Sequence, residues 1–208
     1  MILNKLFIFL FLFCAVTYAQ DEGNYIITIG DETINYKMGE ELEYDVRKKG
    51  PLKITVKQKE VLNYSDGIVS FNHNIHFPVS ETILDEGIKQ ILAMSSTGTG
   101  VIIQEYEGYN PELMIDLMLN EITKESIDYG YKESVSPIEI ITSDNKVMKG
   151  KKSILTYQGS ADEWIVVAYG EKDKGVLVMT MLMDATGINV EANFIEDFFK
   201  SLKIYSEK

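Results

Sequence analysis

The residues that could do chemistry are few in this chain, and their spacing favours no catalytic or metal centre. The two histidines, His73 and His76, lie three positions apart. On an extended strand, residues at that spacing point to opposite faces, so the two imidazoles cannot bind one zinc ion. A helix would bring them together, but Asn72, Asn74 and Pro78 argue against a helix here. We therefore expect no metal site at the histidines.

Nucleophilic catalysis also lacks a clear set of residues. The single cysteine, Cys14, lies in a segment that we expect to be removed, which leaves no thiol for catalysis, disulfides or metal binding. No Gly-x-Ser-x-Gly run marks an activated serine. The glycines around Thr97 lack the Gly-Lys-Ser/Thr ending of a phosphate-binding loop. The sequence predicts no catalytic residue and no cofactor, with a serine–histidine hydrolase left as an alternative.

Other residue patterns have structural interpretations that compete with functional ones. Met179, Met181 and Met183 fall on one face of a strand and can bind Cu(I) there, but the apolar residues around them favour core packing. Pairs of acidic residues lack the spacing of a calcium loop, which favours solvated turns. A local group of lysines either protects an edge strand or binds an anionic partner; its members are Lys146, Lys149, Lys151 and Lys152.

The first 19 residues have the pattern of a cleavable secretory signal. Lys5 precedes a short apolar run, and Ala19 supplies the small residue before the cut, so cleavage leaves Gln20 first. The apolar run is shorter than the roughly 20 residues of a membrane span. A lipoprotein signal at Cys14 is the alternative, but Phe13 occupies a position that requires a small residue. We expect an exported protein, either periplasmic or extracellular.

Composition limits the partners of the mature chain. The formal net charge of the full sequence is −12, and it becomes −12 − 1 = −13 when Lys5 leaves with the signal. Such a charge repels nucleic acid and anionic membrane surfaces. No linker or low-complexity tract divides the sequence, so residues 20–208 are predicted to form one domain. Residues 20–66 are expected to form an N-terminal extension of β-hairpins.

The elements that must position any site follow from the apolar periodicity. Hairpins are expected up to residue 106, followed by a helix that begins at Asn110-Pro111 and ends at Gly130. Four strand-like runs come next, over 135–142, 153–157, 164–169 and 176–183, and short turns make them a meander. A Phe-rich helix covers about 190–202. The expected fold is α+β, with an antiparallel β-sheet sandwiched by helices.

The helix that begins at Asn110 has more apolar surface than one sheet can cover. Its main stripe consists of Met114, Ile115, Met118, Leu119 and Ile122, while Leu113 and Leu117 lie off that stripe. We expect the N-terminal hairpins to cover the extra residues. Otherwise they are open to a ligand or partner, and the candidate binding residues are Leu113, Met114, Leu117 and Met118.

The order of elements and the ending Phe198-Phe199 through Ser201-Leu202-Lys203-Ile204 resemble the PsbP-like superfamily of photosystem II extrinsic and envelope proteins. The resemblance covers about residues 67–204. It implies an antiparallel sheet sandwiched by helices, and a non-enzymatic accessory or binding role. No functional residue of that superfamily can be matched to this chain. The signal ending at Ala19 also resembles those of exported proteins of Bacteroidota-type bacteria.

Three functions are therefore compared. The first is an exported accessory protein that binds another protein of the envelope. The second is a carrier that holds a small apolar ligand between the first helix and the sheet, and the third is a hydrolase. A deep apolar cavity favours the carrier, and a flat, aromatic-rich exposed patch favours the binding protein. A cleft that holds a histidine against a serine or carboxylate favours the hydrolase.

Overall fold

The computed structural model describes residues 24–38, 40–45, 52–185 and 190–205, so the expected signal peptide lies outside the described residues. Of the described residues, 54% lie in strands and 18% in helices, and these strands form three antiparallel sheets. The expected α+β fold, with one antiparallel sheet sandwiched by helices, is therefore wrong. The protein is mainly β, and the additional strands come from residues 54–85, where the sequence indicated only part of them.

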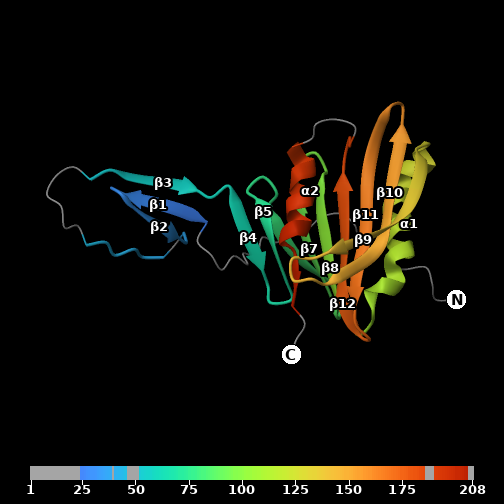
Figure 1. Cartoon of the computed structure of the whole chain (residues 1–208), viewed down its shortest axis with the longest axis horizontal. Helices are drawn as coiled ribbons and strands as arrows, with labels where there is room; N and C mark the ends of the chain where they lie inside the picture. Colours follow the sequence, from blue (N-terminus) through green and yellow to red (C-terminus); the bar gives the residue numbers. More distant parts are fainter. Residues whose placement is uncertain (1–23, 39, 46–51, 186–189, 206–208) are drawn as a thin grey trace.

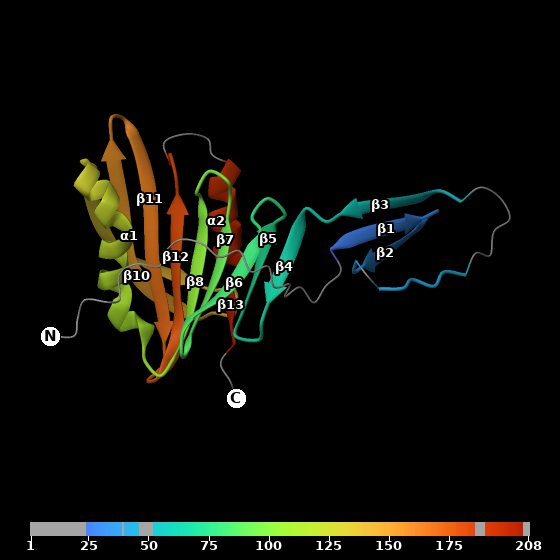
Figure 2. The same cartoon turned by 180° about the vertical axis from the view of Figure 1, so that it is seen from behind.

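The largest sheet has seven antiparallel strands in the order β6-β7-β8-β12-β11-β10-β9. Figure 1 labels all of them except β6, which is labelled in Figure 2. The expected four-strand meander corresponds to β9–β12. Because β12 pairs with β8, this meander and the β6–β8 strands that come before the first helix in the sequence form one continuous sheet. The central strands β11 and β12 are buried on both faces, as their continuous apolar runs predict. The strands are β6 (Val79–Asp85), β7 (Ile88–Met94), β8 (Gly100–Glu107), β9 (Lys132–Ile141), β10 (Val147–Tyr157), β11 (Ser160–Gly170) and β12 (Lys174–Leu182).

One face of the large sheet is covered by a small sheet and a helix together. The small sheet, in the order β13-β5-β4, consists of β4 (Val61–Ser65), β5 (Val69–Asn74) and β13 (Lys203–Ile204). Helix α2 (Val190–Ser201) packs on β5, where the ring of Phe198 meets that of Phe71 edge-on at 5.1 Å. Phe194 stacks on Phe77 at 3.8 Å. The Phe-rich helix therefore shares its layer with strands, which is why the helix-sandwich expectation fails.

The opposite face of the sheet carries the first helix (Figure 2). Its first turn is a 3-10 helix, η1 (Pro111–Met114), which continues into α1 (Ile115–Tyr129). The Asn110 side chain accepts a hydrogen bond from the Glu112 N–H at 2.9 Å, as the capping pattern predicts. The helix ends at Gly130, whose φ of 117° is left-handed. Leu119 packs into the core beneath α1, against β10 and β11.

A third sheet forms an arm that extends away from the rest of the molecule (Figure 1). This arm consists of β1 (Tyr25–Ile29), β2 (Glu32–Tyr36) and β3 (Ile54–Gln58), in the order β2-β1-β3. The hairpin predicted at its start is confirmed. Residues 40–45 fall within the expected hairpins but are not in a strand. No described residue of the arm belongs to either hydrophobic core.

Within the described part of the chain, no helix has the length and apolar character needed to cross a membrane. The expected absence of a membrane span is consistent with this finding.

Candidate functional site

The candidate residues of the first helix divide between two environments. Met114 and Met118 are partly buried and pack against the core beneath α1. Leu113 and Leu117 point outward, with 86% and 52% of their surfaces exposed. The arm lies at the opposite end of the molecule, and β4 packs on the other face of the large sheet (Figure 1). The expectation that residues 20–66 cover these two leucines is therefore wrong for the described part of that segment. We call the surface around Leu113 and Leu117 the outer face of α1.

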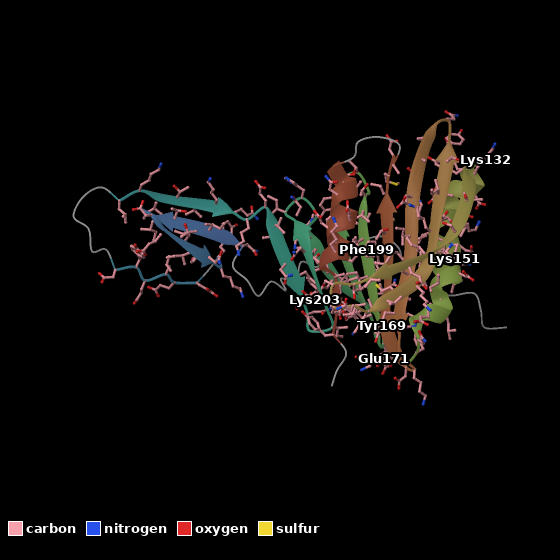
Figure 3. All side chains as sticks on the ribbon, viewed as in Figure 1. Lys132, Lys151, Tyr169, Glu171, Phe199 and Lys203 are labelled. Carbon is pink, nitrogen blue, oxygen red and sulfur yellow. The ribbon has the colours of Figure 1, made fainter. Side chains whose placement is uncertain are left out.

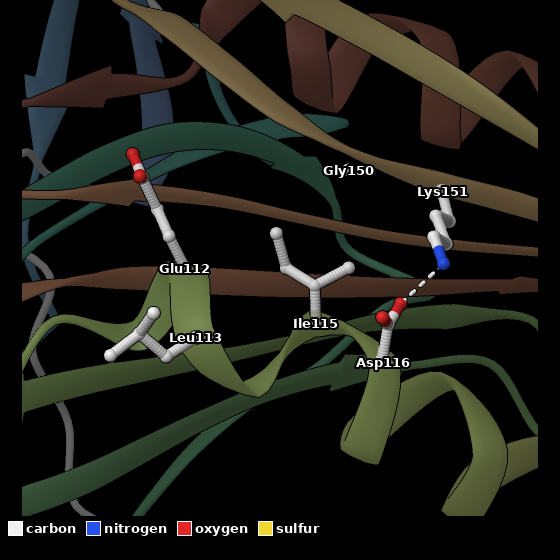
Figure 4. Close-up of a pocket in the computed structure, with 6 residues that line it drawn as sticks. All are labelled: Glu112, Leu113, Ile115, Asp116, Gly150 and Lys151. Carbon is white, nitrogen blue, oxygen red and sulfur yellow. Dashed lines mark ion pairs between the residues drawn. The ribbon is translucent and has the colours of Figure 1, made fainter.

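A shallow depression lies beside this face (Figure 4). Its volume is about 260 Å³, and Leu113 and Ile115 supply its apolar side chains. Asp116 and Lys151 also line it and form an ion pair at 2.5 Å. Since Glu112 adds a further charge, the lining suits water or a polar group better than an apolar ligand. The depression therefore gives little support to a carrier of small apolar molecules.

The remaining surface of α1 is predominantly acidic. Glu121 and Glu125 add two carboxylates to it, and the single lysine of α1, Lys124, is paired with Asp128 four residues on. Asp116 is paired with Lys151 of β10, which lies beside the helix (Figure 3). The outer face of α1 thus presents two exposed leucines that are bordered by acidic side chains.

The lysines that the sequence suggested as an anionic-partner site are each matched with a carboxylate. Because every ammonium has a nearby acid, they do not form an unbalanced positive patch. The ion pairs are Lys146–Asp144 at 3.9 Å, Lys149–Glu139 at 3.9 Å, Lys151–Asp116 at 2.5 Å, and Lys152–Glu163. This pairing favours the structural interpretation of the lysine group.

Three tyrosines gather near the C-terminal end of α1. The rings of Tyr131 and Tyr157 stack at 5.0 Å, and Tyr129 meets Tyr157 edge-on at 5.3 Å. Tyr129 is 69% exposed. Tyr131 and Tyr157 are half-buried, so the group offers one accessible ring and not the aromatic-rich surface that was expected for a protein-binding function.

The histidines are placed for structural roles. His73 is buried on β5, and its Nδ1–H points at the backbone oxygens of Phe77 and Asn74, at 3.0 and 3.2 Å. Burial lowers the pKa of His73, so the ring is neutral at pH 7. His76 lies beyond the end of β5. With only 3% of its surface exposed, His73 is poorly placed to act as a base for a serine that meets a substrate.

A group of buried charges that the sequence did not indicate lies between the small sheet and the large one. Lys89 Nζ lies 2.5 Å from Asp66 Oδ2, 3.0 Å from Glu81 Oε2 and 3.9 Å from Glu105 Oε2. It also donates to the Tyr64 hydroxyl at 3.3 Å. We call these five residues the carboxylate–lysine cluster. Glu105 is only 4% exposed, and among the described residues neither of its carboxyl oxygens has a hydrogen-bond partner in bonding geometry.

The electrostatics of this cluster depend on Glu105. Its burial, together with the neighbouring charge of Asp66, raises the pKa of Glu105 to about 8. Burial alone would also raise the pKa of Asp66, but hydrogen bonds from Lys89 and backbone N–H groups lower it below its ordinary value. The same carboxylates raise the pKa of Lys89 despite its partial burial. Asp66 and Lys89 are therefore charged, and Glu105 carries a proton at neutral pH.

No family model matches this chain. No curated protein matches it either. The resemblance to the PsbP-like superfamily therefore stays a prediction, and the case for a function rests on the residues themselves.

One sequence signal could have revealed the cluster. Glu105 shares a strand face with Val101 and Ile103, so the two-residue period of β8 places a carboxylate on the core side. A charge at such a position requires a partner. Lys89 supplies it from the neighbouring strand, and within the described residues no group of histidine, cysteine or acidic side chains is arranged to hold a metal ion.

Proposed function

We propose that the protein is an exported, non-enzymatic accessory protein of the cell envelope or extracellular space. It binds another protein through the outer face of α1. The observation that carries the proposal is the exposure of Leu113, at 86%, beside Leu117 at 52%. Burying a leucine contributes about 1.5–3 kcal/mol, so two exposed leucines on adjacent turns offer a partner substantial binding energy.

The chemistry of the partner follows from the charge around these leucines. Glu121, Glu125 and the acidic whole molecule attract a positively charged surface and repel an acidic one. The best complement is a folded protein that presents an apolar pocket or ridge bordered by lysine and arginine. Attraction between such exposed charges weakens as salt is added.

Site-specific photo-crosslinking tests the binding proposal. A photoreactive phenylalanine analogue at position 117 should give a discrete adduct in cells that export the protein, and Leu113→Asp should abolish it. The control carries the same analogue at Ile83 of β6, which is 70% exposed but lies on the edge of the sheet away from α1. Equal adducts from both positions, or none from position 117, would contradict the proposal.

Export is tested separately by intact-mass spectrometry of the protein from its own cells. The pattern of residues 1–19 leads us to expect an N-terminus at Gln20. A retained, lipid-modified Cys14 would instead support the lipoprotein alternative.

A further inference from the structure

The carboxylate–lysine cluster connects segments that are distant in the sequence. Asp66 lies in the turn between β4 and β5, and Tyr64 comes from β4. Glu81, Lys89 and Glu105 come from β6, β7 and β8 of the large sheet. The cluster is therefore a polar contact that holds the β4–β5 hairpin to the large sheet. This hairpin also carries the arm, because β3 and β4 are separated by only residues 59 and 60.

Asp66 already has a full set of partners. Its Oδ1 accepts from the backbone N–H groups of Ile68 and Val69, each at 2.9 Å. Its Oδ2 accepts from Lys89 at 2.5 Å and from the Tyr64 hydroxyl at 3.2 Å. These bonds fix the hairpin turn in position over the sheet.

Glu105 stands in contrast to Asp66. Its nearest cation, Lys89, is 3.9 Å away and is engaged more closely by Asp66 and Glu81. Three carboxyl groups thus surround one ammonium in a site where Glu105 and Asp66 are nearly excluded from water. A second buried negative charge beside Asp66 would have to share Lys89 with Asp66 and Glu81, and a buried charge that is only partly compensated is strongly destabilising. A proton on the carboxyl group of Glu105 removes this second negative charge.

We propose that the carboxylate–lysine cluster is a proton-operated latch. With a proton on its carboxyl group, Glu105 lets the β4–β5 hairpin close on the large sheet. When that proton passes to solvent, the Glu105 and Asp66 carboxylates repel one another, and the hairpin and the arm attached to it loosen. The core beneath α1 is not involved, because it lies on the other face of the sheet.

The charged and titratable groups that face Glu105 are compatible with a single switching event. They are Tyr64 and Asp66 from the hairpin, Glu81 from β6 and Lys89 from β7. Burial and the nearby carboxylates raise the pKa of Tyr64, so its hydroxyl stays protonated. Asp66 and Lys89 stay charged across the same range. The adjacent residue of β12, Val176, carries no charge.

Hydrogen exchange of the intact protein, read by mass spectrometry, tests the latch. After correction for the intrinsic pH dependence of exchange, peptides from residues 61–74 should open about tenfold more often at pH 9 than at pH 6, while peptides from α1 should not change. Glu105→Gln should remove the pH dependence of the hairpin. Glu107→Gln, which changes an exposed glutamate two positions further along the same strand, should leave it as in the wild type.

Two results would overturn the proposal: a wild-type hairpin equally protected at both pH values, or a pH dependence that survives in Glu105→Gln. A direct measurement does not depend on any variant. Carbon-13 NMR of the glutamate side chains in the wild-type protein should show one carboxyl group that titrates well above the rest. A spectrum in which every glutamate titrates below about pH 6 would also overturn the latch.

Discussion

Leu117 and Leu119 are two positions apart in the first helix and lie in opposite environments. Leu117 is 52% exposed, whereas Leu119 is 3% exposed in the core beneath α1. Leu117→Ala should therefore cost less than about 1 kcal/mol of unfolding free energy. Leu119→Ala, the matched control, should cost about 2–5 kcal/mol because it leaves a cavity. Urea unfolding of both variants measures the difference, and equal losses would mean that the outer face of α1 is covered.

Glu105 makes stability depend on pH in a definite direction. Its pKa is about 8 in the folded protein and about 4.3 in an unfolded chain, so folding favours the protonated form. The stabilisation is complete below the unfolded pKa and is lost as the pH rises through the folded pKa. We expect the wild type to be less stable at pH 9 than at pH 5, by about 2 kcal/mol or more.

The variant Glu105→Gln separates this effect from other ionisations. Glutamine is neutral throughout the range, so the fall in stability between pH 5 and pH 9 should largely disappear. Urea midpoints at several pH values, with Glu107→Gln as the control, measure it. An unchanged slope in Glu105→Gln would show that another group is responsible.

At the scale of elements, local signals predicted α1 well and the sheet poorly. Asn110, Pro111 and Gly130 act within one helical turn of the backbone groups they satisfy, so the sequence shows both ends of the helix. The pairing of β8 with β12 joins residues about 70 positions apart, and no local pattern records it. The short strands β4 and β6 were missed for the same reason. Which of their two faces is buried depends on how the sheets pack, and the local sequence does not show that packing.

The candidate sites also divide into those that a local pattern predicts and those that depend on long-range packing. Leu113 and Leu117 were identified because their angular position on a helix is a property of the helix alone. Whether anything covers them depends on where the arm lies, which the sequence did not indicate. Glu105 was missed because its partner Asp66 approaches it only after two sheets have packed together.

The packing of α2 gives a prediction for that element. Phe198 is fully buried and contacts the rings of Phe71, Phe194 and Phe199. Phe198→Ala should cost about 3–5 kcal/mol and loosen the β4–β5 hairpin, because it removes the main contact between α2 and β5. Phe199 is only partly buried, so Phe199→Ala should cost clearly less. Chemical denaturation of the two variants provides the comparison, and a reversed order would contradict this packing.

On the scale of the whole molecule, the arm and the body are predicted to be energetically separable. The two hydrophobic cores are built entirely from residues after position 60, and the arm contributes none of its described residues to them. A mature chain that begins at Lys59 should therefore melt within about 4 °C of the full mature protein, which corresponds to about 1 kcal/mol for a chain of this size.

Deletion from Lys203 onward is the matched control, because it removes β13 and the buried Ile204 from the small sheet. That variant should melt well below the arm deletion in differential scanning calorimetry. A fall of more than about 10 °C on removing the arm would instead show that the arm stabilises the body, and the β4–β5 hairpin would then need the arm to stay closed.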